Sequence, residues 1–193
     1  MKPIILLAHP YCKSFNHHIK DVVVESYKQK GYVPVVIDLS EEGFNPVLST
    51  EDLRLYMRGE SSDPKVYAYQ TLLRDCDELV LIFPIWWYEA PAQLKGFLDK
   101  VFLPGFAFDE TKDGLVGKLG HIKKTTILTT SEVETEFMRE KVGNPIETSL
   151  LGTTFEICGI TSDKLWLNCE HIASGSEIER LQFLENVRTR ILT

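Results

Sequence analysis

Three short stretches of the chain hold the residue types that most often bind ligands or take part in chemistry. They are HPYCKSFN (residues 9–16), FPIWWYEAP (residues 83–91) and TTSEVETEF (residues 129–137). In the second stretch, Pro84 should end a strand and Pro91 can begin a helix, so the residues between them form a loop. Trp86, Trp87 and Tyr88 therefore lie in a loop, where their apolar surface requires a cover.

The first stretch delivers polar groups to the start of a helical pattern. Ser14 and Asn16 stand where unpaired backbone N–H groups and the helix dipole favour an anion such as phosphate. The stretch contains no carboxylate, and donors or positive charge come from Lys13, His17 and His18. Ser14 or Asn16 also fits a simple N-cap, so a phosphate site requires a second feature beside it.

Strands and helices alternate along the predicted chain. Short apolar runs predict five strands, at residues 2–9, 34–40, 77–84, 123–131 and 163–170. Helical spacing with start and stop residues predicts helices at 16–31, 64–76, 91–103, 145–158 and 176–191, and allows a short helix after Ser49 or Thr50. Apolar, non-alternating strands separated by helices are typical of a parallel sheet that helices cover on both faces.

We therefore predict a single α/β domain over residues 1–193, a three-layer sandwich with a five-stranded parallel sheet in the flavodoxin-like order 2-1-3-4-5. In this order ligands bind at the carboxyl edge, between the first and third strands. The polar and aromatic stretches follow the first, third and fourth strands. A phosphate cradle beside an aromatic wall is typical of a flavin or nucleotide site. Without a ligand, the tryptophans would cap the sheet or form a subunit interface.

Composition argues against several classes of function. The 193 residues are 44% hydrophobic and 25% charged, and no apolar run approaches the about 20 residues of a membrane span. A net charge of −7 without a lysine and arginine block argues against a nucleic-acid surface or an anionic membrane as partner. MKPIILLAHPY is too short an apolar run for a signal peptide and lacks a small-residue cleavage site, which predicts a cytoplasmic protein.

Neither the cysteines nor the histidines form a metal pattern. The cysteines, Cys12, Cys76, Cys158 and Cys169, are far apart and include no CxxC pair. The histidines have no partner at ligand spacing, so we predict no metal. The thiols are expected to be mostly buried and reduced, with Cys12 in its loop as the exception.

HPYCKSFN, FPIWWYEAPAQLKGFLDKVFLPGFAF and the TT turn resemble the NAD(P)H:quinone oxidoreductase family of flavodoxin-like flavoproteins. This family includes quinone reductases and ancillary subunits of glutathione-gated potassium efflux systems. The resemblance implies a homodimer that holds FAD, with FMN as the alternative, and passes two electrons from NAD(P)H to a quinone or similar small acceptor by a ping-pong mechanism. The alternative is a flavin-binding regulatory or ancillary subunit with little turnover.

The resemblance also implies a set of cofactor contacts. For the phosphate and ribityl chain they are His9, Ser14, Phe15, Asn16 and His18; for the isoalloxazine wall, Pro84, Ile85, Trp86, Trp87 and Tyr88; and for the turn at the polar edge of the ring, Thr129, Thr130 and the following Ser131. No catalytic side chain is assigned, because the cofactor itself carries the hydride chemistry.

The third stretch departs from the family pattern. The family usually has two glycines after its paired threonines, and some members then offer a tyrosine and a histidine to the ring. Here Ser131 and Glu132 follow Thr130, Phe137 stands about where the tyrosine would be, and no histidine occurs before His171. Hydrogen bonds to the charge of a reduced flavin must then come from elsewhere.

Large apolar residues also suggest a subunit interface. Residues 86–88 and 102–108 hold more aromatic surface than one pocket can hide, which predicts a self-complementary interface between two copies. Within the second segment, Gly105–Phe108 is expected either to add to the ligand pocket or to enter the core.

Overall fold

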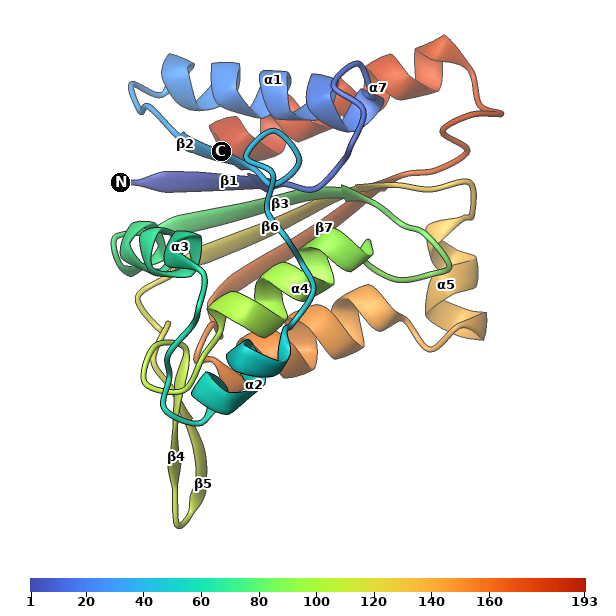
Figure 1. Cartoon of the computed structure of the whole chain (residues 1–193). Helices are drawn as coiled ribbons and strands as arrows, with labels where there is room; N and C mark the ends of the chain where they lie inside the picture. Colours follow the sequence, from blue (N-terminus) through green and yellow to red (C-terminus); the bar gives the residue numbers. More distant parts are fainter.

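Five strands form one parallel sheet in the computed structural model, which describes all residues 1–193 (Figure 1). They are β1 (Pro3–Leu7), β2 (Val35–Asp38), β3 (Glu78–Pro84), β6 (Lys124–Thr130) and β7 (Asp163–Cys169), in the order β2-β1-β3-β6-β7. This confirms the predicted 2-1-3-4-5 order. Every residue of β1 is buried, as is expected of a central strand covered on both faces.

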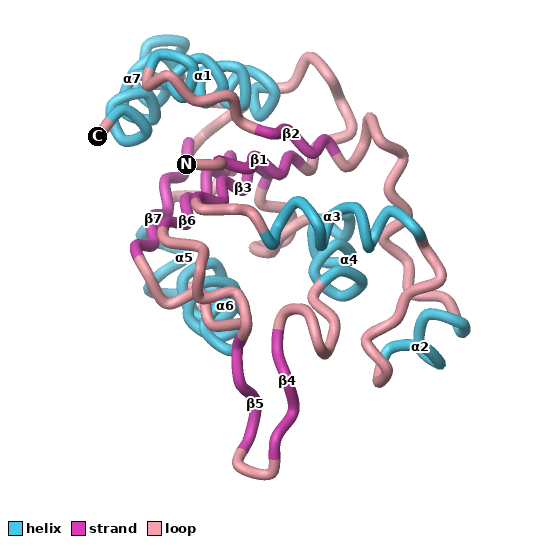
Figure 2. Tube along the Cα trace, turned by 90° about the vertical axis from the view of Figure 1, so that its left-hand side faces the viewer, coloured by secondary structure: helices cyan, strands magenta, loops and turns pink.

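Helices cover both faces of the sheet (Figures 1 and 2). One face carries α1 (Phe15–Gln29) and α7 (Glu177–Leu192), whose apolar residues pack on the sheet together. The other face carries α3 (Pro64–Arg74), α4 (Ala92–Val101), and the π-helix η1 (Ile146–Thr154), which continues into α6 (Phe155–Ile157). No helix is long and apolar enough to cross a bilayer.

Two parts of the fold were not predicted. Helix α5 (Thr135–Lys141) lies beside the carboxyl edge of the sheet and overlaps the end of the stretch interpreted as a loop, residues 129–137. Its one buried residue, Met138, gives no helical apolar stripe. The hairpin of β4 (Phe108–Thr111) and β5 (Gly114–Gly117) projects from the helical layer (Figure 2). Its short strands are almost wholly exposed, so they have no core-facing alternation.

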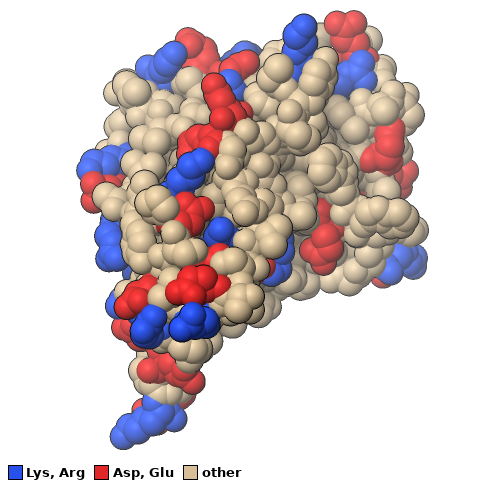
Figure 3. All heavy atoms as spheres, in the orientation of Figure 1, with Lys and Arg blue, Asp and Glu red and all other residues tan.

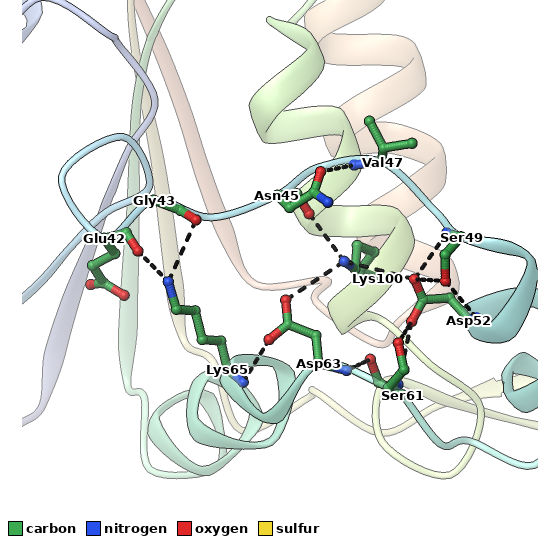
Figure 4. Close-up of polar contacts among 11 residues, drawn as sticks. Glu42, Gly43, Asn45, Val47, Ser49, Asp52, Ser61, Asp63, Lys65 and Lys100 are labelled. Carbon is green, nitrogen blue, oxygen red and sulfur yellow. Dashed lines mark hydrogen bonds and ion pairs between the residues drawn. The ribbon is translucent and has the colours of Figure 1, made fainter.

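A buried lysine fixes the connection between β2 and α3 against helix α4 (Figure 4). The Nζ of Lys100 donates to the carbonyl oxygen of Asn45 at 3.1 Å. It also lies 3.8 Å from Oδ2 of Asp52 and 3.6 Å from Oδ2 of Asp63. Only 4% of the Lys100 side chain is exposed, so this cation depends on protein partners.

Gly96 explains how the connection approaches α4 so closely. A Cβ at this position would lie 2.2 Å from the carbonyl oxygen of Pro46, a distance that no side chain permits. The glycine therefore lets the segment before α2 (Thr50–Tyr56) lie directly on the helix. The connection crosses from the carboxyl edge of the sheet to the far helical layer, as Figure 1 shows.

Asp52 has a second set of partners besides Lys100. Ser49 caps α2, and both its backbone N–H and its hydroxyl donate to the Asp52 carboxylate, at 2.9 and 2.8 Å. The hydroxyl of Ser62 donates to the other oxygen at 2.7 Å. Burial by itself raises the pKa of Asp52, but the hydrogen bonds from Ser62 and Ser49 outweigh this effect and hold the pKa well below the usual carboxyl range.

Charged side chains of both signs are intermixed on the face seen in Figure 3. The chain has 21 lysines and arginines against 28 aspartates and glutamates. The visible face has no continuous basic patch of the kind that follows a nucleic-acid backbone.

Candidate cofactor site at the carboxyl edge of the sheet

The three stretches singled out in the sequence meet at the carboxyl edge of the sheet. The backbone N–H of Ile85 donates to the carbonyl oxygen of Thr130 at 2.8 Å, which joins the loop after β3 to the end of β6. The hydroxyl of Thr130 donates to Oδ1 of Asn16 at 3.0 Å, which joins the end of β6 to the start of α1. The edge is therefore one hydrogen-bonded surface.

The aromatic loop is a tight hairpin with a strained turn. Trp86 and Glu89 exchange two backbone hydrogen bonds of 3.1 Å each. The two residues between them, Trp87 and Tyr88, have φ values of 53° and 66°. A type I′ turn requires positive φ at both central positions and normally uses asparagine or glycine there. Bulky residues in such conformations cost about 1–3 kcal/mol each and are concentrated at functional sites.

The hairpin forms one wall of an open pocket of about 470 Å³. The pocket is lined by Ile85, Trp86, Trp87, Tyr88, Ser131, Glu132 and Val133. Trp87 is 93% exposed and Trp86 is 48% exposed, so the indole surfaces face solvent in the isolated chain. A flat ring system stacked on this wall would cover apolar surface that is otherwise hydrated.

A polar pocket of about 360 Å³ lies next to the start of α1. Its lining includes His9, Cys12, His17, Lys20 and Asp38. Ser14 is the N-cap of α1 and accepts the backbone N–H of His17, which leaves the backbone N–H groups of Phe15 and Asn16 without a partner in the protein. This combination of free N–H groups, a lysine and histidines suits a phosphate group.

His9 presents a hydrogen-bond donor in its neutral form. Its Nδ1 accepts from the backbone N–H of Tyr11 at 3.0 Å, so the ring proton of the neutral form lies on Nε2. Burial lowers the pKa of His9 below its ordinary value, and the nearby His17 ring lowers it further. The His9 ring lies 6.1 Å from the Trp86 ring, which places the polar and aromatic parts of the edge side by side.

Asn16 supplies the test of whether a flavin fits. Its side chain is buried, and Oδ1 already accepts from Thr130. Its Nδ2 is also buried and has no hydrogen-bond partner in the protein. An unsatisfied buried amide costs about 1–3 kcal/mol, so an acceptor from a ligand is expected at this position. A phosphate or ribityl oxygen has the required chemistry, and the residues present fit a flavin.

The sequence profile of the flavodoxin-like fold family matches residues 1–184. The chain belongs to this family. An uncharacterized NAD(P)H oxidoreductase of Haemophilus influenzae is 29% identical over 161 residues, which cover 83% of this chain and 79% of that protein. The NAD(P)H dehydrogenase (quinone) 1 of Rattus norvegicus and an uncharacterized NAD(P)H oxidoreductase of Escherichia coli are each 33% identical over 55% of this chain. The chain spans about half the length of these two relatives, 45% and 55%.

Two solved structures show the same fold. An NAD(P)H:quinone oxidoreductase from Methanothermobacter marburgensis has a TM-score of 0.86 at 24% identity, covering 100% of this chain and 98% of that one. An FMN-dependent NADH-azoreductase from Bacillus anthracis, solved in complex with FMN, has a TM-score of 0.78 at 19% identity, covering 98% and 97%.

In this flavodoxin-like protein, two of the residues assigned to the ring edge use their hydroxyl groups elsewhere. The Thr129 hydroxyl donates to Oδ1 of Asn168 and accepts from Nε1 of Trp166, both at 2.8 Å. The Ser131 hydroxyl donates to the carbonyl oxygen of Val133 at 2.6 Å. Thr130 points to the opposite side of β6 from Thr129, because side chains alternate along a strand. Toward α1, β6 therefore offers the Thr130 hydroxyl.

The remaining residues assigned by resemblance occupy different environments. Pro84 is buried at the end of β3. Phe15 is half-buried, and its ring lies 5.9 Å from that of His18 and 6.5 Å from that of Phe183 in α7. His18 itself is exposed on α1. Phe15 thus contributes to the contact between α1 and α7 as well as opening the helix.

The structure corrects the interpretation of residues 102–108. Phe102, Leu103, Phe106 and Ala107 are buried within the chain, and the Arg74 guanidinium lies 5.2 Å from the Phe106 ring centroid. Phe108 lines a separate pocket of about 290 Å³ between α4 and η1. The segment therefore belongs to the core and to the pocket between α4 and η1. It adds no wall to the aromatic pocket of its own chain.

The loop that departs from the family carries its own hydrogen bonds. The Glu132 carboxylate accepts from the backbone N–H groups of Ala173 and Ser174, with Oε1 distances of 3.2 and 2.9 Å. Phe137, on α5, has its ring centroid 6.4 Å from that of Tyr88. The carboxylate and the phenyl ring are thus both held beside the aromatic hairpin.

Sequence analysis did not assign a role to the pair of His17 and Asp38. The His17 ring contacts Ser14 through Nδ1 at 2.9 Å and Asp38 through Nε2 at 3.0 Å. The three-residue spacing of Ser14 and His17 places them on adjacent turns of a helix start, and Asp38 ends the strand beside β1. The spacing of Ser14 and His17 and the order of the strands were the signals from which the sequence could have revealed this pair.

Proposed function

We propose that the protein is a flavin-dependent NAD(P)H oxidoreductase that passes two electrons to a quinone or similar small acceptor by a ping-pong mechanism. The observation that carries this proposal is the exposed aromatic hairpin at the same edge of the sheet as the buried side-chain nitrogen of Asn16, which has no partner in the protein. The names of the relatives support the reaction type.

The chain's own groups bind and orient the reactants. The Trp86–Tyr88 wall covers one side of a ring system, while Asn16 and the first turn of α1 bind the phosphate and ribityl oxygens. The bound flavin would supply the chemistry, by accepting hydride from NAD(P)H and giving two electrons to the acceptor. The pocket beside the hairpin is open, so NAD(P)H and acceptor can occupy it in turn.

The cofactor that we propose is FAD, with FMN as the alternative. The SFN motif (residues 14–16) favours FAD by its similarity to the quinone reductases, whereas the azoreductase with the same fold holds FMN. The first turn of α1 suits the phosphate of either. Release of the cofactor from purified protein, followed by chromatography and absorbance, distinguishes them.

A homodimer in the cytoplasm belongs to the same proposal. Exposed apolar residues lie on the aromatic hairpin and on the projecting β4–β5 hairpin, where Leu115 is 49% and Val116 is 53% exposed. Two separate apolar projections on one chain are suited to a self-complementary contact with a second copy. All four cysteines are free, as a reducing compartment requires.

The deciding experiment measures flavin content and turnover together. We expect purified protein to be yellow, and Trp86→Ala to lose flavin several-fold, because aromatic stacking contributes about 0.5–1.5 kcal/mol beyond burial. Tyr67→Ala, which removes an exposed aromatic ring on α3, is the matched control and should retain flavin. Protein that takes up neither FAD nor FMN contradicts the proposal. Bound flavin with negligible quinone turnover favours the regulatory subunit instead.

A further inference from the structure

Ser14, His17 and Asp38 form a continuous hydrogen-bonded relay at the proposed phosphate end of the site. We infer that binding of the cofactor phosphate is coupled to protonation of His17, which thereby determines whether Ser14 has a proton to donate. His17 is a positioning residue in this scheme, since it acts on the ligand through Ser14. The inference rests on the proposed flavin site and extends it to the proton balance of binding.

Asp38 fixes one end of the relay. Its Oδ1 accepts the backbone N–H groups of Ser40 and Glu41, both at 3.0 Å, so the carboxylate has a set orientation at the end of β2. Its Oδ2 lies 3.0 Å from Nε2 of His17. Both side chains are largely buried, at 11% and 13% exposure, which limits their replacement by water.

The balance of hydrogen-bond donors and acceptors determines where the protons of His17 and Ser14 lie. An ionised carboxylate only accepts hydrogen bonds, so Nε2 of His17 must carry a proton. In a neutral ring Nδ1 then has none and must accept the Ser14 hydroxyl proton across their 2.9 Å contact. Ser14 has one such proton, and it is directed to His17 while the ring is neutral.

A phosphate oxygen also accepts only, so it competes with His17 for that proton. When His17 is protonated on both nitrogens, Nδ1 donates to Ser14, and the Ser14 hydroxyl is free to donate to phosphate. The imidazolium also adds a positive charge one hydrogen bond away from the anion. Phosphate binding and proton uptake therefore favour each other, as linkage requires.

Other titratable groups border the relay and must be distinguished from it. From the loop after β1, the His9 ring lies 6.2 Å from the His17 ring, and Cys12 lines the same pocket. From α1 the pocket receives Lys20, and from the loop after β2 it receives Glu41. His9 is the main competitor for the proton, because its ring faces His17 directly.

The test is titration calorimetry of flavin-free protein with FAD in buffers of different ionisation enthalpy. FAD is the main probe, because its pyrophosphate has no second ionisation near neutral pH, whereas a phosphate monoester such as FMN titrates near pH 6. At pH 8, where histidine is ordinarily neutral, we expect FAD binding to be accompanied by net proton uptake. Affinity should fall as pH rises, by at most about tenfold per unit. Riboflavin, which lacks phosphate, should bind without uptake.

Two variants isolate the relay. In Asp38→Asn the amide nitrogen can donate to Nε2, so a neutral His17 carries its proton on Nδ1 and leaves the Ser14 hydroxyl free. FAD should then bind at pH 8 without proton uptake. His17→Gln, which cannot gain a proton, should also lose the uptake and flatten the pH dependence. His121→Gln, at a distant histidine that contacts the carbonyl oxygen of Leu73, is the control and should retain the uptake.

The outcomes separate this inference from the proposed function. If no flavin binds, both are wrong. Tight FAD binding to the wild type without proton uptake overturns the coupling alone. Uptake that persists in His17→Gln but disappears in His9→Asn assigns the proton to His9 and also overturns it. Uptake that is lost in both relay variants and retained in the control establishes it.

Discussion

Phe137 tests, at the scale of one residue, how the loop that departs from the family affects turnover. Its ring lies beside Tyr88, and the Ser131 hydroxyl already donates to a backbone carbonyl. A preorganised donor at a developing charge contributes about 2.7–4 kcal/mol in comparable sites. Phe137→Tyr should therefore raise the rate of flavin reduction by NAD(P)H about tenfold or more, as measured by stopped-flow bleaching. Phe137→Leu controls for the change of ring, and an unchanged rate in the tyrosine variant places the phenol away from the flavin.

Cys12 is expected to be the one reactive thiol. Burial raises the pKa of the Cys76 thiol to about 12, and burial is also the main reason that the pKa of Cys158 and Cys169 is raised to about 11. Cys12, by contrast, is exposed. Because the thiolate is the reactive form, a disulfide reagent at pH 8 should titrate one thiol in native protein and four after denaturation. FAD should slow the native reaction, because Cys12 lines the pocket of His9 and His17. Cys12→Ser should abolish it.

At the scale of an element, helix α4 depends on its buried cation. Lys100→Met leaves Asp52 and Asp63 without their positive partner, and removal of one member of a buried ion pair costs about 3–5 kcal/mol. We expect a loss near the lower end, about 3 kcal/mol in urea unfolding, since Asp52 retains its serine hydrogen bonds. Lys95→Ala breaks an exposed pair on the same helix and should lose less than about 1 kcal/mol. Equal losses would contradict the argument.

The aromatic hairpin should show a trade between stability and binding. Trp87 is almost fully exposed at φ 53°, a conformation that asparagine adopts readily. Trp87→Asn should raise the unfolding free energy of flavin-free protein by about 1 kcal/mol while weakening flavin binding. Trp86→Asn, whose backbone has no positive φ, should weaken binding without the gain in stability. If Trp87→Asn destabilises the flavin-free protein, the turn is not strained by its side chain.

At the scale of the whole molecule, the 22.1 kDa chain should sediment as a dimer at micromolar concentration. The burial of Phe102 and Phe106 removes part of the apolar surface that first suggested an interface. The two hairpins retain the rest, and a stable interface usually covers about 800 Å² per partner. Val116→Asp, at the exposed β5, should shift the equilibrium toward monomer, while Lys112→Asp at the tip should not. A flavin-bound monomer would contradict the prediction.

The sequence by itself determined the features that depend on neighbours along the chain. Apolar runs defined the five strands, their alternation with helices predicted a parallel sheet, and Ser14 appeared as a helix start. The carboxyl edge as the candidate site followed from the parallel arrangement, because parallel strands all end at the same edge. These patterns involve residues close together in the sequence, so they can be recognised before the tertiary packing is known.

Only the tertiary structure decided which polar groups are already paired. Thr130 meets Asn16 across 114 positions and His17 meets Asp38 across 21, and no local pattern records such contacts. The same holds for Lys100, whose partner carboxylates, Asp52 and Asp63, lie on another part of the chain. It also holds for Phe106, because an aromatic ring suits a pocket as well as a core. Residue type tells what a side chain can do, but packing determines which partner it reaches and therefore which groups remain free for a ligand.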